Sequence, residues 1–258
     1  DAPVAKTFVD TINGSWPVGK VWLMYDGENA KTNFTSTLIS NGVPAEVIGA
    51  GQQIEFIPMV LDAFWMIDFG PLPIVNDQDR VSFLDWKYYP DRYNDDAVPS
   101  KLGEIWNTTT YRMPASYEGG NFQADGMGTC YTTERGLQYS GVSSTKLAQL
   151  YEDYAGCTNL VVLKDIHDDG TGHIDMFFKL FAVDGTILGS FTTGQDPVSA
   201  QDMDDNEAIL DAVPLPGGAK MRVFRSPHPD HAGSGFNATP LTFLNSTIMN
   251  GVNLWPMY

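Results

Sequence analysis

A histidine and a carboxylate, His173 and Asp175, stand two residues apart at the start of an apolar run, Met176-Phe-Phe-Lys-Leu-Phe181. The run is typical of a β-strand, in which residues two apart point to the same face. A base beside a carboxylate at the entry of a strand suits proton transfer. The sequence therefore predicts one site shared by both side chains, although such a pair also occurs as a plain structural feature of a strand end.

Three further groups of polar residues fall where strands or turns are expected. They are Trp65-Met-Ile-Asp68-Phe-Gly-Pro71, Glu118-Gly-Gly-Asn121 followed by Asp125-Gly126, and Asn245 ahead of the Asn250-Gly251 turn. Each group also has a structural explanation. Asp68 could satisfy backbone donors, and Glu118 and Asn121 could simply build a turn. Asn245 begins an Asn-x-Ser/Thr sequon and could be a surface residue.

The elements that must position these residues alternate between strands and helices. Residue patterns predict strands at 21–25, 54–58, 157–165, 187–192 and 221–224, helices at 35–40, 95–103, 146–154 and 201–213, and hairpins at 122–133 and 248–256. No Pro/Ser-rich linker interrupts the series. We therefore expect one α/β domain over residues 1–258, built from modules of similar structure.

Taken in this order, the motifs resemble the guanidine-modifying hydrolases and transferases, and most closely the agmatine deiminases and bacterial peptidylarginine deiminases. The resemblance runs from about Val21 to Tyr258 and includes Asn94-Asp-Asp-Ala-Val-Pro99 and the closing segment 245–256. It implies a pseudo-fivefold α/β propeller, the pentein-like fold, around a central site.

The resemblance also implies a reaction. A cysteine thiolate would attack the guanidinium carbon, ammonia would leave, and water would hydrolyse the thiouronium intermediate to a ureido product such as citrulline. Asp68 and Asp175 would hold the guanidinium through charge-assisted, bidentate hydrogen bonds. His173 would protonate the leaving amine and then activate water, while Glu118 would orient the imidazole. The expected substrate contacts are Trp65, Asn121 and Asn245.

Two departures from the family pattern bear on this expectation. The family has arginine before the first aspartate, in a Trp-x-Arg-Asp context, whereas this chain has Ile67, which cannot form ionic contacts. The family nucleophile follows the hairpin that here ends near Tyr258. We therefore expect an incomplete last module, with the thiol supplied from beyond residue 258 by a C-terminal fragment or another subunit covering the open edge. Cys130 and Cys157 lack the family's surroundings for a nucleophile, and they could form a disulfide or remain free.

Two alternatives remain open at this stage. The chain could be a catalytically inactive relative that uses the same fold for binding or assembly. A structural calcium site is a further alternative, because oxygen-rich acidic loops can hold this ion. Its candidate ligands are clustered in the sequence: Asp165, His167, Asp168, Asp169 and His173. No other cofactor is expected.

The formal net charge of −17 over 258 residues argues against binding to nucleic acid or anionic membranes and would attract a cationic substrate. No apolar run approaches the roughly 20 residues of a membrane span. The start at Asp1 without an initiator methionine is typical of a processed end. Asn-x-Ser/Thr sequons begin at Asn13, Asn33, Asn107, Asn237 and Asn245. We expect a secreted, extracellular or periplasmic protein.

Overall fold

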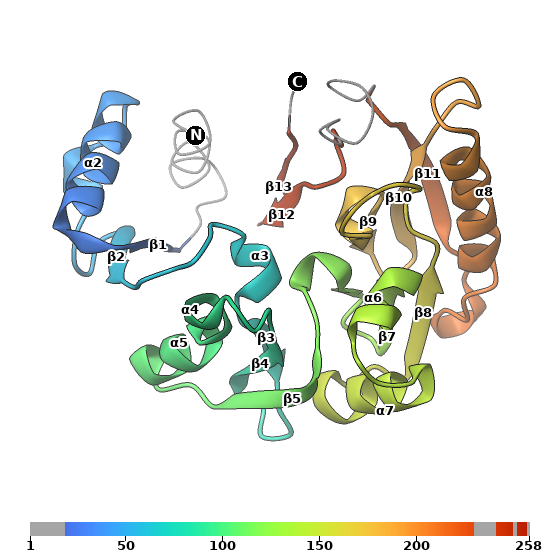
Figure 1. Ribbon diagram of the computed structural model, residues 1–258, viewed down its shortest axis with the longest axis horizontal. Helices are drawn as coiled ribbons and strands as arrows, with labels where there is room; N and C mark the ends of the chain where they lie inside the picture. Colours follow the sequence, from blue (N-terminus) through green and yellow to red (C-terminus); the bar gives the residue numbers. More distant parts are fainter. Residues whose placement is uncertain (1–18, 230–240, 250–251, 257–258) are drawn as a thin grey trace. The chain divides into compact units, whose positions relative to one another are not determined.

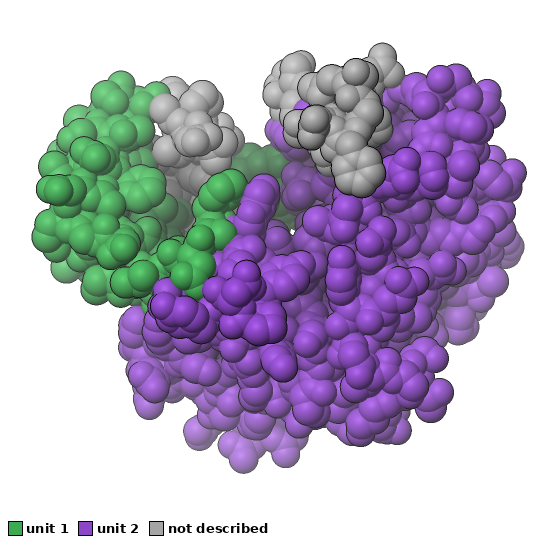
Figure 2. All heavy atoms as spheres, in the orientation of Figure 1, with its two compact units in different colours: residues 1–64, 247–254 green, residues 65–246, 255–258 purple. Residues whose placement is uncertain are grey.

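The structure is a computed structural model that describes residues 19–229, 241–249 and 252–256. Figure 1 shows the order of the elements along the chain. The chain divides into two compact units, coloured separately in Figure 2: residues 1–64 with 247–254, and residues 65–246 with 255–258. The single domain expected over 1–258 stays a prediction. Within the described ranges, no helix has the length and apolar character needed to cross a membrane.

The larger unit repeats one arrangement three times. Two strands form an antiparallel pair, and a helical crossover then brings a third strand parallel to the second, as a parallel pair requires. The sheets are β3 (Leu72–Val75), β4 (Val81–Lys87) and β5 (Thr110–Ser116); β6 (Gln123–Ala124), β7 (Thr129–Thr133) and β8 (Asn159–Leu163); and β9 (Phe178–Ala182), β10 (Gly185–Ser190) and β11 (Arg222–Pro227). This repetition agrees with the predicted modules of similar structure.

The crossovers begin and end at recognisable capping residues. They contain α4 (Tyr93–Asp96) and α5 (Val98–Trp106), α6 (Glu134–Tyr139) and α7 (Ser144–Ala155), and α8 (Pro197–Asp211) followed by η4 (Pro216–Gly218). The Ser143 hydroxyl accepts the Lys146 amide at the start of α7, and Gly156 ends that helix with φ of 70°. Helix α8 begins earlier than predicted because the Asp196 carboxylate caps it and Pro197 fits its first position.

Strand β7 contributes to two hydrophobic cores. Cys130 belongs to a core with Trp86, Met113 and Tyr151, whereas its neighbour Tyr131 belongs to a core formed by other residues of the unit. Successive strand residues point to opposite faces, so both faces of this strand are covered. All residues of β7 are buried, and the strand forms a rigid support next to the turns described below.

The smaller unit contains β1 (Val21–Tyr25) in a parallel pair with β2 (Ile54–Pro58), connected through α2 (Gly27–Ser40) and η1 (Ala45–Val47). Helix α2 begins at Gly27 rather than at residue 35 as predicted. Its first half is polar, so no apolar period marks the helix there. The antiparallel strands β12 (Thr247–Met249) and β13 (Val252–Leu254) form the expected hairpin. Its turn residues, Asn250 and Gly251, lie outside the described residues.

Short helical turns carry the residues of chemical interest. They are α3 (Met66–Phe69), η2 (Gly119–Asn121) and η3 (Ile174–Met176). Turn α3 contacts η2, and η2 contacts η3. The predicted strand starting at His173 was therefore wrong in its first residues, since β9 begins only at Phe178. Gly172, with φ of 63°, redirects the chain, and the Phe177 amide then bonds to the Ile174 carbonyl in a 3₁₀ turn.

Candidate active site

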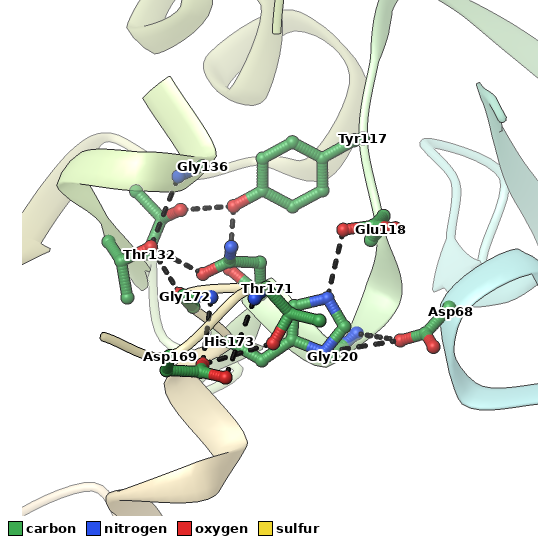
Figure 3. Close-up of polar contacts among 12 residues, drawn as sticks. Asp68, Tyr117, Glu118, Gly120, Thr132, Gly136, Asp169, Thr171, Gly172 and His173 are labelled. Atoms are coloured by element: carbon green, nitrogen blue, oxygen red, sulfur yellow. Dashed lines mark hydrogen bonds and ion pairs between the residues drawn. The ribbon is translucent and has the colours of Figure 1, made fainter. Parts of the chain in front are cut away.

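The imidazole of His173 lies between two carboxylates, as Figure 3 shows. Its Nε2 is 2.9 Å from Oε2 of Glu118, and its Nδ1 is 3.7 Å from Oδ1 of Asp68. The same Asp68 oxygen accepts a hydrogen bond of 3.1 Å from the Gly120 amide. All three side chains are largely buried. The ring orientation is therefore fixed by groups from α3 and from the segment that leads into η2.

The two glycines after Glu118 permit this close approach. A Cβ atom on Gly120 would lie 2.5 Å from Nδ1 of His173 and 2.7 Å from Oδ1 of Asp68. A Cβ atom on Gly119 would lie 1.9 Å from the Ile67 carbonyl oxygen. The Gly-rich segment does build a turn, as one interpretation of the sequence held. That turn also lets backbone, imidazole and carboxylate meet, which only glycine allows at these distances.

A cavity of about 510 Å³ in the larger unit brings most of the predicted residues together. Its lining combines buried carboxylates and His173 with aromatic and apolar side chains: Trp65, Ile67, Asp68, Tyr89, Arg92, Glu118, Asp169, Thr171, His173, Asp175, Met176, Thr242, Asn245 and Pro256. His173 and Asp175 thus share one site, as predicted. The 3₁₀ turn η3 brings them there, and not the alternation of a strand.

The Asp175 carboxylate is the most unusual group in this cavity. The residue is 6% exposed, and its Oδ1 has no hydrogen-bond partner among the described residues. A buried oxygen without a donor costs free energy comparable to that of a lost hydrogen bond. Asp175 is therefore prepared to accept a hydrogen bond from a ligand, and a cationic donor would form the strongest one.

Burial and neighbouring charges set the protonation of the site. Burial alone would lower the pKa of His173, but the hydrogen bond to Glu118 and the charges of Asp68 and Asp175 outweigh it and raise that pKa to about 9. Burial would raise the pKa of Glu118, yet the bond to His173 lowers it. Burial also raises the pKa of Asp68, and it raises that of Asp175 to about 7. At neutral pH His173 is therefore a cation paired with ionised Glu118.

The stability of the protein is expected to fall as the pH rises from 6 to 10. The pKa of His173 is raised from 6.5 to about 9 in the folded state, so its contribution is complete below 6.5 and is lost as the pH passes through 9. A shift of this size corresponds to roughly 3 kcal/mol of unfolding free energy.

Urea unfolding at pH 6 and pH 10 should show a smaller loss of unfolding free energy in His173→Gln than in the unmodified protein. The control is His167→Gln, because His167 lies outside the cavity. An equal loss in all three proteins would contradict the assignment.

The remaining predicted residues fall in different places. Trp65 and Asn245 line the cavity and are exposed at its surface, and Ile67, 64% exposed, lies beside them. Asn121 does not line the cavity. It is 1% exposed, and its side-chain oxygen accepts the Thr133 hydroxyl at 2.8 Å. The amide of Asn121 therefore supports the turn, which corrects its expected place among the substrate contacts.

The cavity residues that escaped the sequence reasoning include one aromatic and one cationic side chain. Tyr89 and Arg92 precede the Asn94–Pro99 segment that carried part of the resemblance. Arg92 lies over the Tyr88 ring at 4.9 Å and pairs with Asp95 at 2.9 Å. Burial raises the pKa of Glu118, whereas the hydrogen bonds to His173 and Tyr89 and, to a smaller extent, the positive charge of Arg92 lower it. The Tyr-Tyr-Pro run ahead of the segment is the signal that the sequence offers for these residues.

The acidic cluster considered for calcium does not converge on one point. Asp165 pairs with Arg135, and His167 approaches Asp196. Asp169 accepts hydrogen bonds from the Gly172 amide and the Thr171 hydroxyl, which fold its own loop. Across the described ranges, no three His, Cys, Asp or Glu side chains are arranged to hold a metal ion. The cluster instead shapes the loop that leads to His173.

Cys130 and Cys157 form a disulfide, with their Cα atoms 5.6 Å apart. Both residues are buried, and neither lines the cavity around His173. They are also the two cysteines of the sequence. This chain therefore contains no free thiol, and the alternative of free cysteines is wrong.

Replacing both cysteines with alanine is expected to lower the free energy of unfolding by about 3 kcal/mol, because the bond closes a loop of sequence separation 27. Ligand binding in the His173 cavity should persist, since the disulfide lies elsewhere. Thermal unfolding with and without reductant checks the first expectation: reductant should destabilise the unmodified protein and leave the double variant unchanged. A double variant as stable as the unmodified protein would contradict it.

Comparison with known proteins gives the chain a family context. A family model described as Porphyromonas-type peptidyl-arginine deiminase matches residues 2–258. A relative from Marinomonas sp., named "Putative agmatine deiminase", is 27% identical over 190 residues, which cover 64% of this chain and 52% of the relative. The chain thus spans about half the length of that relative.

Solved structures share the fold. An agmatine deiminase of Enterococcus faecalis superposes with a TM-score of 0.79 at 20% identity, covering 98% of this chain and 74% of the other. An agmatine deiminase of C. jejuni with substrate bound, in which one cysteine is replaced by serine, superposes with a TM-score of 0.77 at 19% sequence identity. The match covers 98% of this chain and 72% of the other. These likenesses give the chain the α/β fold of the deiminases.

Proposed function

The chain belongs to the Porphyromonas-type peptidyl-arginine deiminase family, and on that premise we propose that it provides the guanidinium-binding and acid–base groups of a deiminase active site. The observation that carries the proposal is the convergence of Asp68, Glu118, His173 and Asp175 on one cavity. The substrate class is a guanidinium compound, either agmatine or a peptidyl arginine. The net charge of −17 favours such a cation.

Asp68 and Asp175 hold the guanidinium in this proposal. Both are buried carboxylates that line the cavity, and Oδ1 of Asp175 has an unused acceptor position among the described contacts. A guanidinium offers several N–H donors in a planar arrangement, which suits two carboxylates better than a single point charge does. The apolar lining from Trp65, Ile67 and Met176 accommodates the uncharged part of the substrate.

His173 moves the protons. As a cation with a pKa of about 9 it can protonate the departing amine, so that ammonia leaves. The neutral imidazole that results can then take a proton from the water that attacks the intermediate, which restores the cation. Glu118 holds the ring through the bond of 2.9 Å and stabilises its charge throughout.

In this proposal the nucleophile comes from outside residues 1–258, since both cysteines of this chain are joined in a disulfide. We propose that a cysteine thiolate is supplied from sequence beyond residue 258 or by another subunit. The same segment would complete a pseudo-fivefold propeller. Three complete modules, together with the pairs β1–β2 and β12–β13, are consistent with such an arrangement.

Export to the cell surface or periplasm is part of the same proposal, and the glycosylation sequons are compatible with it.

Calorimetry on this chain tests the binding half of the proposal. Agmatine and an arginine peptide should bind, and their neutral ureido counterparts should bind at least about tenfold more weakly, because they lose the charge-assisted bonds. Equal affinity for the charged and neutral ligands would overturn the proposal.

A colour assay for ureido groups tests turnover, combined with intact-mass analysis of the purified material. Product formation that iodoacetamide abolishes, from a preparation with an additional cysteine-bearing polypeptide, would support the deiminase. A single species of 28.4 kDa that binds agmatine without turnover would favour an inactive relative used for binding or assembly. The buried disulfide and the exposed Ile67 are the observations on which that second candidate depends.

A further inference from the structure

Lys179 is a partly buried cation that follows the cavity residues Asp175 and Met176 in the chain. It lies on β9, four residues after Asp175, and is not among the residues that line the cavity. Its Nζ donates a hydrogen bond to the backbone carbonyl of Ser246. Burial lowers the pKa of Lys179, and the charge of Asp175 opposes this effect. Because burial removes water from an ammonium group, such a position is maintained only where carbonyl or anionic partners replace the water.

The segment Thr242–Ser246 is fastened to the same part of the chain at two points. At one end the Thr242 hydroxyl donates to the Met176 carbonyl at 2.6 Å, and at the other end Lys179 binds Ser246. Between these points lies Asn245, which lines the cavity and whose amide is 3.9 Å from the Met176 sulfur. Lys179 thus contacts the segment that contains Asn245, and its positive charge favours the ionised form of Asp175.

We infer that Lys179 is a positioning residue that keeps Asp175 ionised and holds Asn245 at the cavity, so that both can meet a guanidinium group. The inference rests on the proposed function, because it concerns the ligand-binding form of the same site. Lys179 itself does not line the cavity, so a cationic ligand would not meet it directly.

The charges around Asp175 explain why this lysine matters. Burial, Asp68 and Asp169 favour the neutral carboxyl group, whereas His173 and Lys179 favour the carboxylate. With these contributions the pKa of Asp175 is already raised to about 7. Removing the lysine charge would raise it further, and a neutral carboxyl group cannot form an ion pair with a guanidinium.

The test compares Lys179→Met, which removes charge and donor, with Lys179→Arg, which retains both. The control is Lys146→Met on the exposed surface of α7. One measurement is the ¹³C NMR titration of the Asp175 carboxyl group in the protein without ligand. The other is the affinity for agmatine by calorimetry from pH 6 to pH 9.

In Lys179→Met we expect Asp175 to titrate at higher pH than in the unmodified protein. A rise of about one unit in the pKa of Asp175 should weaken agmatine binding about tenfold at pH 6 and about fivefold at pH 7, and the difference should narrow towards pH 9. Lys179→Arg should restore most of the affinity. Lys146→Met should match the unmodified protein in both measurements.

An unchanged titration of Asp175 in Lys179→Met would overturn the inference. So would a loss of affinity by the same factor at every pH, because that result would mean that the lysine acts only through the position of the Thr242–Ser246 segment and not through the charge of Asp175. If the unmodified protein binds no agmatine, the proposed function fails instead. The NMR titration then still decides whether Lys179 controls the ionisation of Asp175.

Discussion

Replacing Gly120 with alanine is expected to lower the affinity for guanidinium ligands by about 10- to 100-fold, because a displaced Asp68 would lose hydrogen bonds to a charged ligand, each of which contributes about 1.5–3 kcal/mol. The added Cβ would lie 2.5 Å from Nδ1 of His173 and 2.7 Å from Oδ1 of Asp68. Neither neighbour can remain where it is, since the imidazole is bonded to Glu118 and Asp68 is buried on α3. Calorimetry with agmatine measures the loss.

The matched control for this change is Gly194→Ala. Gly194 is exposed, and a Cβ atom added there would have the Thr192 hydroxyl oxygen as its nearest neighbour, at 3.9 Å. This variant should bind agmatine as the unmodified protein does. If Gly120→Ala also kept its affinity, the close approach at Gly120 would not be what holds His173 and Asp68 in the binding arrangement.

Replacing His173 with glutamine is expected to reduce turnover by about 10²–10⁴-fold, the usual contribution of a positioned general acid–base. The assay requires protein that carries the cysteine nucleophile. Glutamine can still bond to Glu118, so the fold of the turn should persist, but it cannot donate a proton to the departing amine. The affinity for agmatine should also fall, because the charge of His173 helps to keep Asp175 ionised, but the loss of affinity should be smaller than the loss of turnover.

His167→Gln serves as the matched control, because His167 contacts Asp168 and Asp196 outside the cavity. It should leave both turnover and affinity unchanged. The proton-transfer role of His173 would be refuted by a His173→Gln variant with normal turnover. A variant that lost binding and turnover by the same factor would instead make His173 a binding residue.

The sequence predicted the local features whose causes are local. Strands β1 and β2 were found at their exact residues because each is a short apolar run bounded by turn residues. Helix α7 was recognised from the spacing of Leu147, Leu150 and Tyr151 and from the stop at Gly156. The order of the motifs also predicted the family, which the match over residues 2–258 confirmed.

Features that depend on long-range contacts could not be read in the same way. The sequence offered two explanations for Cys130 and Cys157, and only the pairing of β7 with β8 brought the two residues together. The role of Asn121 was likewise hidden, because its partner Thr133 comes from a different element. Lys179 could not be singled out from the sequence, because its hydrogen bond to Ser246 and its effect on Asp175 arise only in the folded chain.

The sequence by itself therefore determined the residue types of the site, the family and most of the regular elements. The tertiary structure decided how the site is assembled. His173 and Asp175 were expected to share a face through strand alternation, yet a 3₁₀ turn brings them together. Glu118 and Asp68 reach the imidazole, at 2.9 Å and 3.7 Å, only because glycines at 119 and 120 let separate parts of the chain approach so closely. The spacing of apolar residues predicts contacts between neighbours along the chain. The burial and charge of a site residue depend instead on groups far away in the sequence, such as Gly120 and Asp68, which form a hydrogen bond across a separation of 52 residues.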